Sequence, residues 1–333
     1  MNQCKRIFTS GLVTTVLLVC SSWGFLVHRT INQLAIYQLP KAMQPFFLRN
    51  ETYLVQQAVR PDLRRNEDPT EAPKHFIDLE PFGDSAAWKM SHTWSEAIAK
   101  YSKDTLIKYG YVPYWIIEMK SKLTNAFRSS NRDSILFYAA DLGHYIGDAN
   151  VPLHTSVNYD GQLTGQRGLH SLWESMVPEL NMNQYQLYNK RRTRYLTQPE
   201  EAVWNAIRSA HLLVQNVVQQ EQEASKTFND STKYRVQLRN GREVRSYTTS
   251  FAKAYSEKLG NTVNQQLLHS ANLIADIWYT SWVDAGRPNL NHLLDKQPTK
   301  EEKRKWKEEL HAYRSNQLIQ KNLLLARQEK PEE

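Results

Sequence analysis

Apolar side chains recur at three- and four-residue spacing along most of this chain, which is the pattern of amphipathic helices. No segment shows a convincing alternation of apolar and polar residues of the kind that marks a half-buried strand. Prolines and glycines cluster where the helical pattern stops. The pattern therefore predicts an all-α fold, with helices over 29–37, 41–59, 112–129, 132–147, 199–224, 249–284 and 299–328.

The tail of the chain mixes positive and negative residues at helical spacing, as in TKEEKRKWKEEL (299–310). Mixed charge of this kind is typical of a solvated helix, and a helix that docks on a partner or a membrane is the alternative. We therefore expect three parts: an N-terminal segment over 1–22, an all-α domain over 23–295 and a charged helical extension over 296–333.

The first 22 residues resemble an export signal. Lys5 and Arg6 precede a mostly apolar stretch that ends at Cys20, and small residues then precede Trp23. The apolar stretch is shorter than the roughly 20 residues that a membrane-spanning helix needs. We expect cleavage before Trp23 and export to the periplasm or the extracellular space, with retention as an anchor as the alternative.

The chain holds 2 cysteines, Cys4 and Cys20, and both lie in the predicted signal. Cleavage would leave no thiol, so the mature protein must be stabilised by its core or by a bound metal. The formal net charge of +8 weakly favours a polyanion or an anionic membrane surface as a partner. A soluble basic protein is equally compatible with that charge.

Two histidine–carboxylate pairs stand at helical spacing. In GHYIGD, His144 and Asp148 are four residues apart, so they project from one face of a predicted helix, one turn apart. In HSLWE, His170 and Glu174 repeat this spacing. An imidazole and a carboxylate on adjacent turns can reach one divalent ion, whereas a surface ion pair would explain either pair taken alone.

Further candidate ligands flank these pairs. His154 lies two residues after Pro152, which follows the predicted helix 132–147, and His28 lies five residues after Trp23. The segment 60–80 contributes Asp62, Asp68, His75 and Asp78. Each of these is explained equally well, taken singly, as a surface or core residue. Nitrogen and oxygen ligands without thiolates favour zinc, with other divalent ions as alternatives.

The motifs W-G-x-x-x-H, H-F-x-D, G-H-x-x-G-D-x-x-x-P-L-H and L-H-S-x-W-E occur in this order between Trp23 and Glu174. This set resembles the superfamily of trizinc phosphoesterases, which comprises the bacterial zinc-dependent phospholipases C and the single-strand-specific zinc nucleases of fungi and plants. The resemblance implies a multi-helix bundle of the phospholipase C and nuclease type around a trinuclear zinc site.

The resemblance also implies a ligand set. In that superfamily the mature chain begins with a tryptophan whose amino group and carbonyl oxygen bind zinc, so cleavage before Trp23 would create a ligand. Asp68 is the alternative to Asp62. Carried over position by position, one zinc would be held by Asp62, His75, His144 and Asp148, a second by His154, His170 and Glu174, and a third by the Trp23 backbone, His28 and the shared Asp148.

Catalytic and substrate-binding roles follow from the same resemblance. A metal-bound hydroxide would attack phosphorus in line, with Asp62 and Arg65 as catalytic residues. Arg65 would neutralise charge on the phosphoryl oxygens, Phe76 would stack on a base, and Asp78 would accept hydrogen bonds from a base edge. The alternatives are a solvated charge for Arg65, a core aromatic for Phe76 and a turn cap for Asp78.

The substrate stays open between a phospholipid head-group ester and single-stranded nucleic acid. Arg65 and Phe76 favour the nucleases, whereas Glu174 and the cysteine-free mature chain favour the phospholipases. Leu63 and Ala72 stand where the phospholipases place aromatic residues. We expect a phosphodiester substrate, peripheral membrane contact and no protein partner. A non-catalytic, zinc-stabilised interaction protein is the alternative, although structural zinc sites are closed and need only four ligands.

Overall fold

The structure, a computed structural model, describes residues 24–239 and 242–328. Two strands pair antiparallel, β1 (Tyr234–Arg239) and β2 (Arg242–Tyr247). The α-helices are α1 (Phe25–Gln38), α2 (Gln44–Arg49), α3 (Glu51–Gln56), α4 (Arg60–Arg64), α5 (Ala86–Lys89), α6 (Trp94–Tyr101), α7 (Lys103–Tyr109), α8 (Val112–Arg128), α9 (Arg132–Asp148), α10 (Leu169–Ser171), α11 (Val177–Asn181), α12 (Pro199–His211), α13 (Val214–Ser225), α14 (Asp230–Lys233), α15 (Thr249–Leu259), α16 (Thr262–Asp284) and α17 (Lys300–Arg314).

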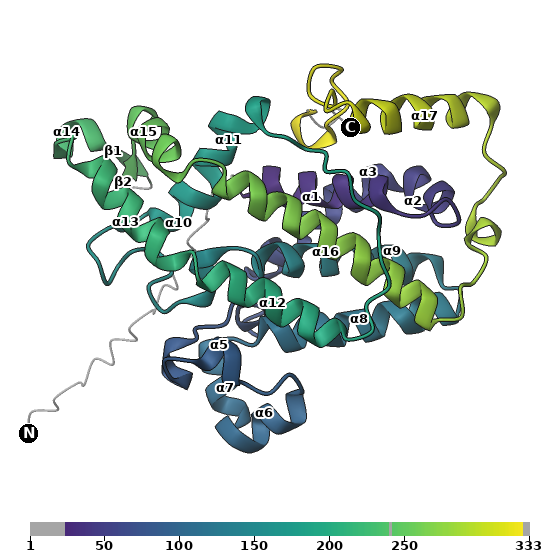
Figure 1. Ribbon diagram of the computed structural model, residues 1–333, viewed down its shortest axis with the longest axis horizontal. Helices are drawn as coiled ribbons and strands as arrows, with labels where there is room; N and C mark the ends of the chain where they lie inside the picture. Colours follow the sequence, from purple (N-terminus) through teal and green to yellow (C-terminus); the bar gives the residue numbers. More distant parts are fainter. Residues whose placement is uncertain (1–23, 240–241, 329–333) are drawn as a thin grey trace, which may run out of the picture.

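The longest helices form a bundle around the main core. α1, α8, α9 and α16 pack against one another, and α12 covers α8 and α16 (Figure 1). Apolar residues at helical spacing on each of these helices turn inward, including the fully buried Ile31, Leu142 and Trp278. The indole nitrogen of Trp278 donates to the carbonyl oxygen of Ala139 at 3.2 Å, so its polar atom is satisfied inside the core.

A second, smaller core lies at one end of the molecule (Figure 1, left). It is built from α10, α11, α13 and α15, the hairpin and a single π-helical turn, η5 (Leu172–Met176). Buried members include Leu153, Leu169, Trp173 and Phe251. This core holds the chain just after the His144–Asp148 pair and around the His170–Glu174 pair.

The described part of the C-terminal extension lies along α1. Ala312, Tyr313 and Leu324 are buried in the main core. The side chain of Gln33 on α1 donates to the carbonyl oxygen of Leu323 at 2.8 Å and accepts from the amide of Leu325 at 2.9 Å. The extension therefore covers the first helix of the bundle.

The all-α prediction is confirmed, but several boundaries differ. Predicted helix 41–59 breaks at Asn50, predicted helix 199–224 breaks between α12 and α13, and predicted helix 249–284 breaks at Gly260. Gly260 has a φ of +59°, a backbone conformation that favours glycine and ends α15.

The expectation that the chain has no strand is wrong for 234–247. Both faces of this hairpin are largely exposed, so no core face imposes a clear apolar alternation. The available signal was the Asn240–Gly241 dipeptide in the sequence, which is a frequent hairpin-turn sequence. In the part of the chain that the structure describes, no helix combines the length and the apolar character needed to cross a membrane.

Candidate metal centre

The histidines and carboxylates of the motifs converge between the two cores. His28 lies in the first turn of α1, Asp62 on α4, and His144 and Asp148 at the end of α9. His75 follows a short turn, and His154 lies in the 3-10 turn η4 (Pro152–Thr155). The ligand-type atoms within each of three groups lie within 4.8 Å of one another: His28, His144 and Asp148; Asp62, His75 and His144; His154, His170 and Glu174.

Asp148 is the central carboxylate, because its two oxygens face different imidazoles. Its Oδ2 lies 2.9 Å from His75 Nδ1 and 3.3 Å from His144 Nε2. Its Oδ1 lies 3.5 Å from His28 Nε2 and 3.7 Å from His154 Nδ1. This is the arrangement of a carboxylate that can bridge two cations.

Glu174 also faces two sides of the cluster. Its Oε1 lies 3.5 Å from His28 Nε2, and its Oε2 lies 2.5 Å from His170 Nε2 and 3.5 Å from His154 Nε2. Glu174 sits in the π-helical turn η5, and such turns in helices are frequent at functional sites because they re-aim side chains.

The nitrogen atoms that face one another show that the cluster fits cations. His144 Nδ1 donates to the carbonyl oxygen of Ala58 at 2.9 Å, so Nε2 of the neutral ring carries a lone pair. That Nε2 lies 3.1 Å from Nδ1 of His75, whose Nε2 faces Glu71 at 3.6 Å. With the His75 proton on Nε2, two lone pairs and carboxylate oxygens would converge on one point, an arrangement that a bound cation stabilises.

The second pair of imidazoles repeats this geometry. His154 Nδ1 donates to the carbonyl oxygen of His75 at 2.7 Å, so Nε2 is the ring atom left to face the other ligands. That Nε2 lies 3.1 Å from His170 Nε2. The amide of Ile77 donates to the carbonyl oxygen of His154 at 2.9 Å, so the backbone joins the two motifs directly.

The charges of the cluster depend on one another. Burial alone would raise the pKa of Asp148, but the imidazoles of His144, His154 and His75 hold that pKa well below its ordinary value. Burial and the adjacent His28 imidazole lower the pKa of His144 to about 4, so its ring is neutral at pH 7. Burial alone would lower the pKa of His154, but the carboxylates of Asp148 and Glu174 raise it to about 9, so metal binding at this ring would release a proton.

Between the two aspartates that competed in the sequence, the structure brings Asp62 to the histidines. Asp62 Oδ1 lies 3.6 Å from His144 Nε2 and 3.7 Å from His75 Nδ1. Asp68 Oδ1 instead accepts from the amide and the hydroxyl of Thr70, at 2.8 and 2.7 Å. Asp68 caps this turn and belongs to none of the ligand groups found among the described residues.

Arg65, Phe76 and Asp78 lie near this centre but are not part of it. Arg65 is exposed, and its Nη1 lies 3.4 Å from Asp62 Oδ1. Phe76 is partly buried and packs against Gly110, where an added Cβ would meet its carbonyl oxygen at 2.2 Å. Asp78 is partly buried, and burial together with the nearby Glu80 carboxylate raises its pKa to about 7.

Trp23 and the predicted signal 1–22 lie outside the described residues.

Glu71 is a contact of the centre that the sequence analysis missed. It is fully buried, faces His75 Nε2, and receives hydrogen bonds from Arg64, Lys74 and Tyr145. Arg64 also pairs with the buried Asp141 at 3.0 Å. Glu71 and His75 are four residues apart, the same spacing as the two recognised pairs, so the signal was present in the sequence.

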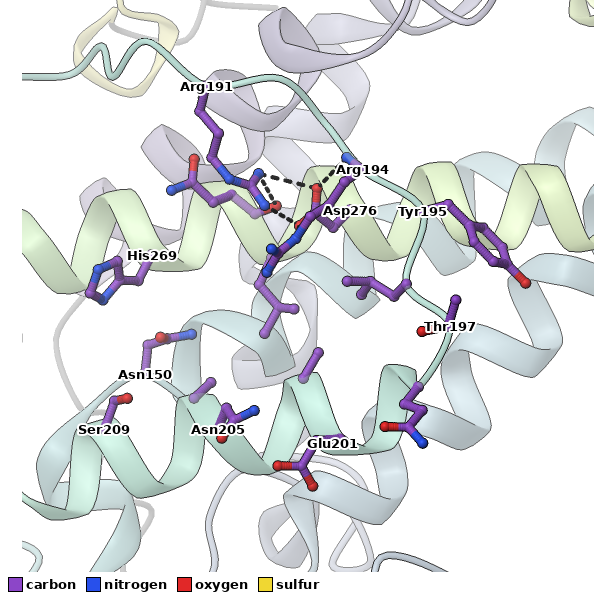
Figure 2. A pocket seen from close by; sticks show the side chains of 16 residues that line it. Asn150, Arg191, Arg194, Tyr195, Thr197, Glu201, Asn205, Ser209, His269 and Asp276 are labelled. Atoms are coloured by element: carbon purple, nitrogen blue, oxygen red, sulfur yellow. Dashed lines mark hydrogen bonds and ion pairs between the residues drawn. The ribbon is translucent and has the colours of Figure 1, made fainter.

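A cavity of about 550 Å³ lies elsewhere, between α12, α16 and the segment 191–198. Figure 2 shows Arg191 and Arg194 directed at Asp276, with His269 and Asn205 farther along the walls. A slot of about 20 Å³ beside His28 and Glu174 shares Asn150 with this cavity. None of the predicted ligands lines the larger cavity.

Residues 23–278 match the family model described as S1/P1 nuclease, so the chain belongs to the S1/P1 nuclease family. This family consists of phosphoric-ester hydrolases, and the prediction of such a hydrolase is confirmed over the non-catalytic alternative. None of the curated proteins matches the chain.

Solved structures that are similar to this chain include two bacterial α-toxins. The α-toxin of Clostridium absonum has a TM-score of 0.47 and 13% sequence identity, and the match covers 83% of this chain and 67% of the toxin. The α-toxin of an avian strain of Clostridium perfringens has a TM-score of 0.44 and 15% identity, and the match covers 78% of this chain and 65% of that toxin.

Proposed function

We propose that this protein is an exported phosphodiester hydrolase that holds three zinc ions at the centre described above. The observation that carries the proposal is the position of Asp148, whose two oxygens face imidazoles of different ligand groups. The proposed ligands are those that the sequence predicted: the Trp23 backbone, His28, Asp62, His75, His144, Asp148, His154, His170 and Glu174.

Zinc bound at this centre would lower the pKa of a bound water and polarise the phosphoryl oxygens of the substrate. The residues of the chain set up that chemistry. Asp148 holds the ligand groups together, and Glu71 orients the ring of His75 through its Nε2. Asp62 is partly exposed, so its carboxylate can accept a proton from an attacking water, and Arg65 beside it can pair with a non-bridging phosphoryl oxygen.

Single-stranded nucleic acid is our first candidate substrate. The match to a nuclease family model supports it, and so does the exposed Arg65 beside Asp62. Phe76 would offer part of its ring to a base, and Asp78 would accept hydrogen bonds from the base edge. A phospholipid head-group ester is the second candidate, favoured by Glu174 and by the absence of cysteine after Cys20.

Asp148→Asn tests the proposed centre. The variant loses one charge of the bridging carboxylate, so hydrolysis should fall by at least about a hundredfold and bound zinc should drop below that of the wild type. Activity is measured on single-stranded RNA, single-stranded DNA and mixed phospholipid vesicles, and zinc by elemental analysis. Asp133→Asn changes an exposed aspartate at the other end of α9 and serves as the control. Full activity and full zinc content in Asp148→Asn would refute the proposed centre.

Cleavage before Trp23 is proposed as part of the function, because it would create the terminal amino group that binds the third zinc. Protein that begins at Trp23 should bind about one more zinc per chain than protein that retains Ser22. N-terminal sequencing of exported protein locates the cleavage site. Equal zinc content in the two forms, or an uncleaved exported chain, would contradict this part of the proposal.

A further inference from the structure

The β1–β2 hairpin exposes aliphatic side chains on both of its faces. Leu238 is 78% exposed and Val236 is 59% exposed, and Val244 is exposed on the second strand. In the register of the hairpin Val236 pairs with Arg245, Leu238 with Glu243 and Gln237 with Val244. Because side chains alternate between faces, Val236 and Leu238 share one face and Val244 lies on the other. Exposed aliphatic groups on a projecting element are typical of an interaction surface.

Positive charges accompany these aliphatic side chains. Residues 234–247 contain four arginines and one glutamate. Arg235 and Arg245 are both exposed, and the Arg245 guanidinium stacks on the Tyr234 ring with a distance of 3.7 Å to its centroid. Aliphatic side chains that enter an interface beside cations that meet charged headgroups are the combination that anionic lipid surfaces bind.

The base of the hairpin is fixed to the chain that carries the metal centre. Tyr247 is buried, and its hydroxyl lies 2.9 Å from Glu221 Oε1 and 3.2 Å from the carbonyl oxygen of Gln166. Lys233 Nζ pairs with the same Glu221 at 2.7 Å. Gln166 begins the short turn that leads into α10 and His170, so the hairpin and this ligand belong to one packed unit.

We propose that the β1–β2 hairpin docks the protein on an anionic phospholipid surface. Val236, Leu238 and Val244 enter the interface. Arg235 and Arg245, the latter also paired with Asp230 at 3.0 Å, contact the lipid phosphates. A second copy of the chain is disfavoured because two hairpins of the same net positive charge repel each other. Single-stranded nucleic acid is disfavoured because it binds cations and aromatic platforms, whereas the most exposed positions of this hairpin are aliphatic.

Docking does not depend on the proposed hydrolysis. Its consequence for the choice of substrate, however, rests on the proposed function. The hairpin is packed on the unit that holds His170 and Glu174, so docking would hold this part of the proposed centre close to the membrane. Phosphodiesters at or near a membrane surface would then be the substrates that meet the centre first.

Leu238→Asp tests the docking surface. Wild-type protein should co-sediment with vesicles of phosphatidylcholine plus phosphatidylglycerol, and less with added salt or with phosphatidylcholine alone. Leu238→Asp should weaken binding to the anionic vesicles about tenfold, because the largest exposed aliphatic group is replaced by a charge that the surface repels. Leu212→Asp is the matched control, since Leu212 is 66% exposed and lies outside the hairpin.

Three results would overturn the docking proposal. The first is that the wild type does not bind anionic vesicles. The second is that Leu238→Asp and Leu212→Asp bind these vesicles equally well. The third is that Leu238→Asp still binds vesicles but no longer binds single-stranded RNA, or no longer forms a dimer in sedimentation analysis. Hydrolysis of the soluble diester bis(4-nitrophenyl) phosphate is measured in parallel and should be unchanged in both variants. If the wild type does not hydrolyse this soluble diester, the proposed function is wrong whatever the vesicle result. The two proposals are therefore tested separately.

Discussion

Both nitrogen atoms of the His75 ring face carboxylates. Nδ1 lies 2.9 Å from Asp148 in the metal centre, and Nε2 faces the buried carboxylate of Glu71. A carboxylate behind a ligating histidine fixes the tautomer and orientation of the ring and strengthens it as a ligand. Arg64, Lys74 and Tyr145 compensate the buried charge of Glu71, so the second partner of His75 is itself fixed.

Glu71→Gln should therefore lower the affinity for zinc by about 10- to 100-fold while the chain still folds. The affinity is measured by competition with a chromophoric chelator, and folding by circular dichroism. Glu67→Gln changes an exposed glutamate in the same segment and should leave the affinity unchanged. An unchanged affinity in Glu71→Gln would show that Glu71 does not position His75.

At the scale of elements, two glycines allow α1 to approach α9. A Cβ at Gly143 would lie 1.9 Å from Asn32 Oδ1, and a Cβ at Gly147 would lie 2.9 Å from His28 Nδ1. The close approach places His28 against His144, with ring centroids 4.0 Å apart. The glycines in G-H-x-x-G-D are therefore required by the helix packing that brings His28 to Asp148.

The contact of α17 with α1 and α3 contains a buried acidic group. The Glu51 carboxylate on α3 accepts a hydrogen bond from the Gln33 side chain at 3.0 Å. Its titratable neighbours are Tyr37 on α1 and Glu309 and Lys305 on α17. Burial and the charge of Glu309 raise the pKa of Glu51 from 4.5 to about 7. Folding therefore favours the protonated form of this carboxyl group.

The sign of the pH dependence follows from this shift. Below pH 4.5 the carboxyl is protonated in both states, and as the pH rises towards 7 the unfolded chain loses the proton first. The free energy of unfolding then falls, by on the order of 3 kcal/mol for a complete shift. Glu51→Gln should reduce the difference in urea midpoint between pH 5 and pH 8, whereas the exposed Glu301→Gln should not. Equal differences in the wild type and Glu51→Gln would contradict the shift.

At the scale of the whole molecule, the metal centre joins the two cores. His28, His144 and Asp148 come from helices of the main bundle, whereas His154, His170 and Glu174 flank residues of the smaller core. The sequence has no cysteine after Cys20, so no disulfide can link these parts in the described chain. Bound metal would then cross-link the two parts.

Metal removal should therefore destabilise the protein measurably. A ligand present at about 1,000 times its dissociation constant adds about 4 kcal/mol, so chelation should lower the thermal midpoint by on the order of 10 °C. Scanning calorimetry with and without chelator measures the change. The double variant His154→Ala and His170→Ala should show a smaller change than the wild type. An equal change in both proteins would place the stabilising metal elsewhere.

The sequence by itself determined the helical class, the family and the order of the motifs. Helical periodicity depends only on neighbours along the chain, so it can be recognised in a short stretch of sequence. The same holds for the four-residue spacing of His144 and Asp148 and of His170 and Glu174. The family resemblance rested on the same local patterns and agrees with the family match.

Only the tertiary structure decided which nearby residues converge. Asp62 and Asp68 are equivalent in the sequence, but α4 turns Asp62 towards His144 while Thr70 holds Asp68 in a turn. The role of Glu71 and the exposed hairpin depend on burial, which is a property of the packed molecule and not of local spacing. Contacts between distant segments follow from how the helices pack, and no periodicity within one segment specifies that packing.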